Sequence, residues 1–131
     1  MVLDSHALMT LLYDEPGADQ VQDHLDRALM GERRVVLLSV SLGEVTSAVE
    51  RRSGEESATF VLSAVDQLAV EVLPTDRQVA LAAGHLRATH GLHYMDALVA
   101  GVAQLEEGTL VTGDRDFEAV ESVVSIEWLP V

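Results

Sequence analysis

Five acidic residues stand where short apolar segments of the sequence begin or end. They are Asp4, Glu44, Asp96, Asp114 and Asp116. Carboxylates gathered at such borders repel one another and lose hydration, so their charged forms need compensation. Oxygen ligands of this kind suit Mg²⁺, which binds few protein groups and keeps several water molecules. The pattern therefore indicates a divalent-cation site assembled from distant parts of the sequence.

Alternating strands and helices are expected to position these acids. Apolar runs predict strands at residues 1–4, 35–38, 70–73, 110–112 and 124–128. Amphipathic or apolar stretches predict helices at residues 6–13, 19–30, from 41 onward, 57–68, from about 76 to 91, 95–105 and 116–120. This alternation predicts an α/β fold, with a mostly parallel sheet of about five strands between helices in three α/β/α layers.

The predicted topology brings the acids to one edge of the sheet. In an open parallel sheet, binding sites form at the carboxyl ends of the strands. Asp4 and Asp114 each follow an apolar strand. Glu44 and Asp96 lie early on helices that start from the same edge. A divalent ion in this crevice would clamp a phosphodiester and activate water, which is the chemistry of a metal-dependent nuclease.

Composition limits the alternatives. The chain has 131 residues, 48% of them hydrophobic, and a mean hydropathy of +0.20, which suits one domain with a well-supplied core. It has no cysteine, which excludes disulfides, thiolate zinc sites and cysteine nucleophiles. No apolar run reaches membrane-spanning length and no export signal is seen, so a cytoplasmic location without membrane contact is expected.

The charge is strongly acidic, with 22 acids against 8 bases and a net charge of −14. All the bases are arginine, and the absence of lysine argues against receiver-type phosphoacceptor domains, aspartate-nucleophile phosphatases and P-loop enzymes. Such a chain is not expected to bind DNA directly, because neutralising phosphates takes a basic surface. Contact with nucleic acid would depend on bound metal and a few arginines, of which Arg115 is the best placed, or on a basic partner.

Four segments, in this order, resemble the motifs of PIN-domain ribonucleases, and within them the VapC toxins of bacterial toxin–antitoxin pairs. They are Val-Leu-Asp-Ser (2–5), Ser-Val-Ser-Leu-Gly-Glu-Val (39–45), Gly-Leu-His-Tyr-Met-Asp-Ala-Leu-Val-Ala (91–100) and Leu-Val-Thr-Gly-Asp-Arg-Asp-Phe (110–117). The resemblance covers residues 1–131 as a single PIN domain. It implies one or two Mg²⁺ ions, for which Mn²⁺ would substitute, and endonucleolytic cleavage of RNA. It also implies a homodimer, inhibited in a heteromeric complex by a cognate VapB-type antitoxin whose tail fills the acidic crevice.

The resemblance also assigns roles to individual residues. Asp4, Glu44, Asp96 and Asp114 match the family's acidic quartet, and Asp116 matches a further acid. We expect Asp4, Asp96 and Asp114 to bind the ion, with Asp116 as an additional ligand. Glu44 is expected to position or deprotonate the attacking water. The hydroxyl residues Ser5 and Thr112 match positions that orient carboxylates or phosphate. Gly113 departs mildly from the family at a position that tolerates many residues.

Each acid also has a structural interpretation, which stays open at this point. Asp4 suits a helix N-cap, and Glu44 suits a capping box with Ser41. Asp96 near a helix start is favoured by the helix dipole, and Asp114 and Asp116 suit a turn. Two other functions also stay open, namely a housekeeping PIN nuclease without an antitoxin and a non-catalytic module that has kept the fold.

Overall fold

The structure is a computed structural model that describes residues 1–130. One sheet holds five short strands in the order β3-β2-β1-β4-β5, and every neighbouring pair is parallel. The strands are β1 (Val2–Leu3), β2 (Val36–Leu38), β3 (Glu71–Leu73), β4 (Thr109–Thr112) and β5 (Ser125–Trp128). The predicted α/β class, strand number and parallel sheet are therefore confirmed.

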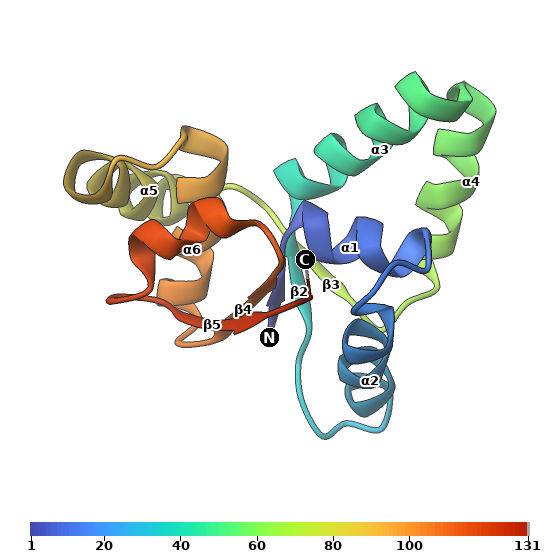
Figure 1. Cartoon of the computed structure of the whole chain (residues 1–131), viewed down its shortest axis with the longest axis horizontal. Coiled ribbons are helices and arrows are strands. Elements are labelled where there is room, and N and C mark those ends of the chain that lie inside the picture. Colours follow the sequence, from blue (N-terminus) through green and yellow to red (C-terminus); the bar gives the residue numbers. More distant parts are fainter. Residues whose placement is uncertain (131) are drawn as a thin grey trace.

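Helices cover both faces of the sheet (Figure 1). One face carries α1 (Ser5–Leu12), α2 (Ala18–Leu29), α3 (Ser39–Ser53) and α4 (Glu55–Asp66). The other face carries α5 (Arg77–His90), α6 (Tyr94–Leu105) and the 3₁₀ helix η1 (Arg115–Val120). The predicted three-layer arrangement is confirmed. None of the helices within residues 1–130 is long and apolar enough to cross a lipid bilayer.

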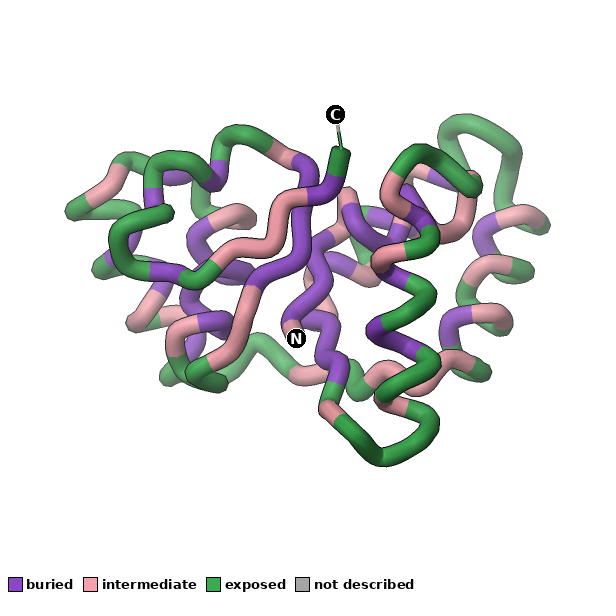
Figure 2. The backbone as a smooth tube through the Cα atoms, turned by 60° about the horizontal axis from the view of Figure 1, so that its bottom comes forward, coloured by how far each residue is buried: buried purple, intermediate pink, exposed green. Residues whose placement is uncertain are grey.

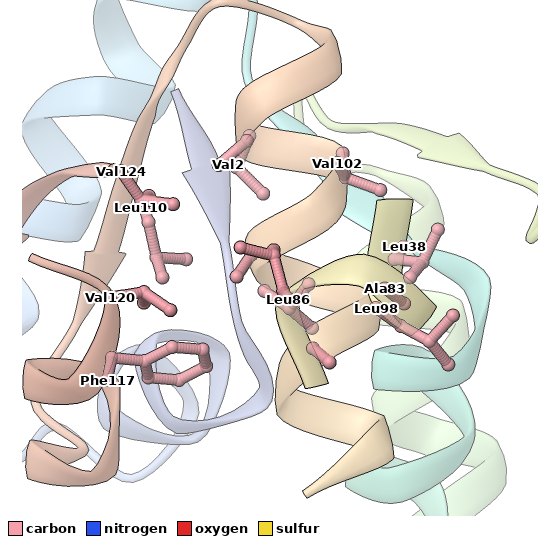
Figure 3. Close-up of a cluster of buried hydrophobic side chains, with 14 of the residues drawn as sticks. Val2, Leu38, Ala83, Leu86, Leu98, Val102, Leu110, Phe117, Val120 and Val124 are labelled. Atoms are coloured by element: carbon pink, nitrogen blue, oxygen red, sulfur yellow. The ribbon is translucent and has the colours of Figure 1, made fainter. Parts of the chain in front are cut away.

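Side-chain alternation along each strand divides the core into two halves. Val2 and Leu110 pack with α5 and α6, whereas Leu3 and Val111 pack with α1 and α2. Figure 3 shows the first half, in which Phe117 of η1 lies among residues of β1, β4 and the two helices. Because both faces of the central strands are covered, β1 and β2 are apolar throughout. The central strands are accordingly buried along their length, as Figure 2 shows.

The chain changes direction across the sheet between β1 and β4. It passes from β1 through β2 to β3 on one side, and then returns to place β4 and β5 on the other side of β1. A crevice at the carboxyl ends of strands is expected at such a switch point. Asp4 directly follows β1 and Asp114 follows β4, so both border this point.

Most helix starts lie one or two residues before the predicted positions, and at two of them the capping also differs from the prediction. Helix α1 begins at Ser5 because Asp4, rather than Ser5, is its N-cap and accepts a hydrogen bond from the Ala7 N–H. Helix α3 begins at Ser39, directly after β2, and has no side-chain cap. Ser41 therefore lies inside the first turn, where it is fully buried and its Oγ has no hydrogen-bond partner among the described residues. The predicted capping box between Ser41 and Glu44 was wrong.

Candidate metal centre

Three of the predicted carboxylates meet at the carboxyl edge of the sheet. Asp96, Asp114 and Asp116 each offer one oxygen, and these atoms lie within 4.8 Å of one another. Asp96 lies in the first turn of α6, Asp114 is the N-cap of η1, and Asp116 lies within η1. Among residues 1–130, no arginine or histidine forms an ion pair with any of the three. A cluster of acids without a base fits a bound cation.

The electrostatics of Asp96 reflect this crowding. Its side chain is half-buried, and its pKa is raised to about 6. Desolvation is the largest cause, followed by the negative charges of Asp114, Asp116 and then Glu44, while His93 acts in the opposite direction. A divalent ion would remove this penalty, since it favours the ionised carboxylates. An all-carboxylate oxygen donor set suits Mg²⁺ or Mn²⁺ better than softer metals.

Asp4 lies beside this cluster, in a buried position. Only 4% of the residue is exposed. One carboxylate oxygen accepts from the Ala7 N–H at 2.7 Å, and the other accepts from the Thr112 hydroxyl. Its pKa is raised to about 7, because desolvation outweighs these two hydrogen bonds and the charges of Asp114 and Asp96 add to it. Asp4 is thus an N-cap, as one interpretation of the sequence held, and its direct contact with an ion stays a prediction.

Thr112 connects the acids into one hydrogen-bonded chain. Its buried hydroxyl donates to Asp4 and accepts from the Asp114 N–H at 3.0 Å. Asp114 Oδ1 in turn accepts from the Asp116 N–H at 3.0 Å. A hydroxyl that bridges two carboxylate-bearing segments fixes their relative position. The geometry is compatible with the orienting role predicted for Thr112, and that role stays a prediction. Ser5, the second predicted hydroxyl, lines the neighbouring cleft.

Glu44 lies apart from the trio, on the exposed surface of α3. Its charge nonetheless contributes to the raised pKa of Asp96, so both face the same region. Glu44 lines a cleft of about 430 Å³ between α1 and α3, whereas Asp96 and Asp116 line a smaller hollow of about 200 Å³ together with His93. Glu44 and the pair Asp96 and Asp116 therefore line two different hollows, and a role for Glu44 toward water or substrate stays a prediction.

Arg115 stands between two of the acids in sequence but is directed elsewhere. Its guanidinium lies over the Trp128 ring, 4.3 Å from the ring centroid. This cation–π contact holds an exposed positive charge near the metal centre without pairing it to a carboxylate. The position is compatible with the predicted role toward substrate.

His6 is a residue that sequence reasoning missed. Its Nδ1 accepts a hydrogen bond from the Gly113 N–H at 3.2 Å. A Cβ added at Gly113 would lie 2.4 Å from His6 Cε1, so no larger residue fits there while the imidazole keeps its place. A glycine directly before Asp114 was the available signal, because an interior glycine often marks a close approach. Nothing in the sequence identified which residue approaches it.

The comparisons with known proteins agree with this architecture. The PIN domain family model matches residues 1–123, and the chain belongs to the PIN domain family. Among curated proteins, none matches the chain in sequence.

Solved structures of toxin–antitoxin proteins share the fold. VapBC2 from Rickettsia felis, bound to a promoter DNA fragment, matches with a TM-score of 0.80 and 19% identity over 98% of each chain. DNA-bound VapBC from Salmonella typhimurium matches with a TM-score of 0.74 and 23% identity, over 96% of this chain and 95% of that one. VapC20 from Mycobacterium tuberculosis, a sarcin-ricin loop cleaving toxin, matches with a TM-score of 0.68 and 18% identity over 98% of each chain.

Proposed function

We propose that this PIN-domain protein is a metal-dependent endoribonuclease of the VapC type, the toxin of a toxin–antitoxin pair. The observation that carries the proposal is the convergence of three carboxylate oxygens within 4.8 Å at the switch point, with no basic partner among the described residues. Such an arrangement is costly for the protein alone and becomes favourable with a cation. The VapBC matches support the toxin assignment.

Each residue of the site has a proposed role that follows from its position. Asp96, Asp114 and Asp116 would hold Mg²⁺, or Mn²⁺ in its place, and Asp4 would complete the set from its buried site. Such an ion, when bound, polarises the phosphodiester and lowers the pKa of water. Glu44 orients or deprotonates the attacking water from across the crevice. Thr112 fixes the relative positions of Asp4 and Asp114 through its two hydrogen bonds. Arg115 would contact the RNA backbone from its place beside the acids in the sequence.

The structural matches and the acidic charge of the chain support a proposed substrate and a proposed partner. RNA is the proposed substrate, and the sarcin-ricin loop cleaving toxin among the structural matches supports it. A VapB-type antitoxin is the proposed inhibitor, because several matches are toxin–antitoxin complexes. With a net charge of −14, the chain would attract an arginine-rich antitoxin segment, and the association rate should fall as salt rises. A homodimer and a cytoplasmic location belong to the same proposal.

The decisive experiment compares the same kind of substitution at the candidate metal centre and at the opposite edge of the sheet. Asp96→Asn should reduce Mg²⁺-dependent RNA cleavage by roughly 10²–10³-fold, since it weakens charge stabilisation at the reacting phosphate. Glu71→Gln, a matched carboxylate-to-amide change at the opposite edge of the sheet, should leave cleavage unchanged. Sequencing of 5′-phosphate RNA ends after induction in cells identifies the cut sites. Undiminished cleavage by Asp96→Asn would overturn the proposal.

A further inference from the structure

A polar cleft adjoins the metal centre on its α1–α3 side. It has a volume of about 430 Å³, within the range of small-ligand sites. From α3 it is lined by Glu44, Ser47 and Arg51, which are spaced three and four residues apart and so share one helix face. From α1 it is lined by Ser5, His6 and Met9. One end of the cleft therefore lies at the proposed water-activating residue.

Arg51 supplies a cation at the other end. It lies seven residues beyond Glu44 along α3, which corresponds to about 10 Å of helix. Its Nη1 donates to Ser47 Oγ at 3.1 Å, which draws the guanidinium back along the helix toward Glu44. Within residues 1–130 it forms no ion pair with an acid, although the chain has 22 of them. A positive charge is thus left available in a strongly acidic protein.

His6 supplies a neutral hydrogen-bond donor to the cleft from the α1 side. Because Nδ1 accepts from the Gly113 N–H, the neutral imidazole carries its proton on Nε2. No group in the described part of the chain accepts a hydrogen bond from Nε2. The close packing against Gly113 fixes the ring in this position. The partly exposed Met9 and Ala48 add apolar surface to the same cleft.

We propose that this cleft binds one nucleotide of the RNA substrate, next to the phosphate that is cut. Arg51 would pair with the phosphate of that nucleotide, the His6 Nε2–H would donate to it, and the base would lie on the apolar wall. The combination of one cation, one neutral donor and apolar surface is complementary to a nucleotide, which carries one anion and one flat ring. This inference rests on the proposed RNA cleavage and extends it to a substrate-binding subsite.

Binding measurements on matched arginine variants test the subsite without relying on turnover. The probe is a fluorescein-labelled single-stranded oligoribonucleotide in Ca²⁺, which takes the same oxygen ligands with looser geometry than Mg²⁺. Arg51→Gln should weaken binding by roughly tenfold, the loss of one charge-assisted contact, and reduce the slope of log Kd against log salt by about 0.7. Arg52→Gln is the control, because Arg52 is the next residue of α3 but lies over the Tyr13 ring, 4.2 Å from its centroid and outside the cleft.

A second pair of variants tests His6. His6→Ala should weaken binding, and Gly113→Ala should do so by displacing the imidazole. The double variant His6→Ala/Gly113→Ala should bind no worse than His6→Ala alone, since there is then no ring to displace. Thermal melts of each variant confirm that the fold is retained. Additive losses in the double variant would show that Gly113 acts independently of His6 and would count against the assigned donor.

Cleavage kinetics locate the subsite along the RNA. Substrates shortened one nucleotide at a time from either end should show a step increase in KM for the wild-type protein when the bound nucleotide is removed. Arg51→Gln should lack that step.

The possible failures are distinguishable. If no RNA is cleaved although Mn²⁺ binds, the proposed function fails. If RNA is cleaved and Arg51→Gln equals Arg52→Gln, the subsite alone is overturned. If Arg51→Gln weakens only antitoxin binding, the cleft is a peptide site, and the subsite is again overturned.

Discussion

Acidic side chains have opposite surroundings at the two edges of the sheet. At the amino edge, Arg34 contacts Glu71 at 2.7 Å and Glu106 at 3.1 Å, so each acid there has a base. At the carboxyl edge, Asp96, Asp114 and Asp116 approach one another with no base in ion-pair distance among the described residues. The first arrangement is complete within the protein. The second leaves its negative charges without a partner among the described residues, and the proposed cation would compensate them.

The contrast is visible in the titration of the groups concerned. Glu71 and Glu106 raise the pKa of the exposed Arg34 guanidinium, so these acids favour its charged form. Burial and neighbouring acids instead raise the pKa of Asp96 to about 6 and that of Asp4 to about 7. The charged form is therefore favoured for Arg34 at the amino edge and disfavoured for Asp4 and Asp96 at the carboxyl edge. Four measurements sharpen or break this comparison.

The largest expected effect is on the pH dependence of stability without metal. Asp4 and Asp96 have raised pKa values in the folded state, so the folded protein binds protons that the unfolded chain has already released. Their stabilising contribution to the free energy of unfolding is therefore fully present below about pH 4 and is lost as the pH rises to about 7. Urea unfolding in a chelator should show lower stability at about pH 8 than at about pH 5, by roughly 2–3 kcal/mol. Most of this difference comes from the buried Asp4, because solvent screens the half-buried Asp96. Saturating Mn²⁺ should shrink the difference, because bound metal requires ionised acids. Stability that rises steadily over this window in the chelator would contradict the unpaired edge.

Metal binding should stabilise the folded protein by a similar amount. At 100 times its dissociation constant, an ion bound only to the folded state adds about 2.7 kcal/mol. Thermal melts with and without Mn²⁺ measure this gain. Asp114→Asn should lose most of it, and Glu71→Gln should retain it. An equal metal response in both variants would mean that the carboxyl edge does not hold the ion.

Loss of the Thr112 hydroxyl should cost about 1–3 kcal/mol, because it leaves the buried Asp4 carboxylate without one of its two donors. Thr112→Val tests this by chemical unfolding, and Thr112→Ser should restore most of the loss. Thr109→Val is the matched control at the amino edge of the same strand, where the hydroxyl meets only Ser125 Oγ at 3.3 Å in an exposed position. Equal losses in the two valine variants would remove the distinction between the edges.

The smallest expected effect concerns stability without metal, which two matched substitutions should change in opposite directions. In a chelator at about pH 8, Asp96→Asn should raise stability by up to about 1 kcal/mol, since it removes repulsion and a desolvated charge. Glu71→Gln should lower stability instead, because it breaks a contact with Arg34. Paired melting curves measure both changes. A loss of stability in both variants would argue that Asp96 is paired rather than repelled.

The sequence predicted the arrangement of elements better than the contacts between them. Apolar runs and their alternation with helices determine the parallel sheet, and the sheet determines that Asp4 and Asp114 reach one edge. The predicted capping box failed because α3 starts at Ser39, two residues earlier, a shift that local propensity does not control. The contact between His6 and Gly113 joins residues 107 positions apart, so only the folded backbone brings it about.

The bridge from Thr112 to Asp4 has a consequence for synthesis of the protein. Asp4 leaves the ribosome well before its hydroxyl partner Thr112, which lies 108 positions later, and β1 lies between β2 and β4. A nascent chain folds from its amino end and holds one half of the carboxylate set long before the other half exists. An incomplete translation product that stops before β4 would therefore lack Thr112, Asp114 and Asp116, and could not assemble the carboxylate set.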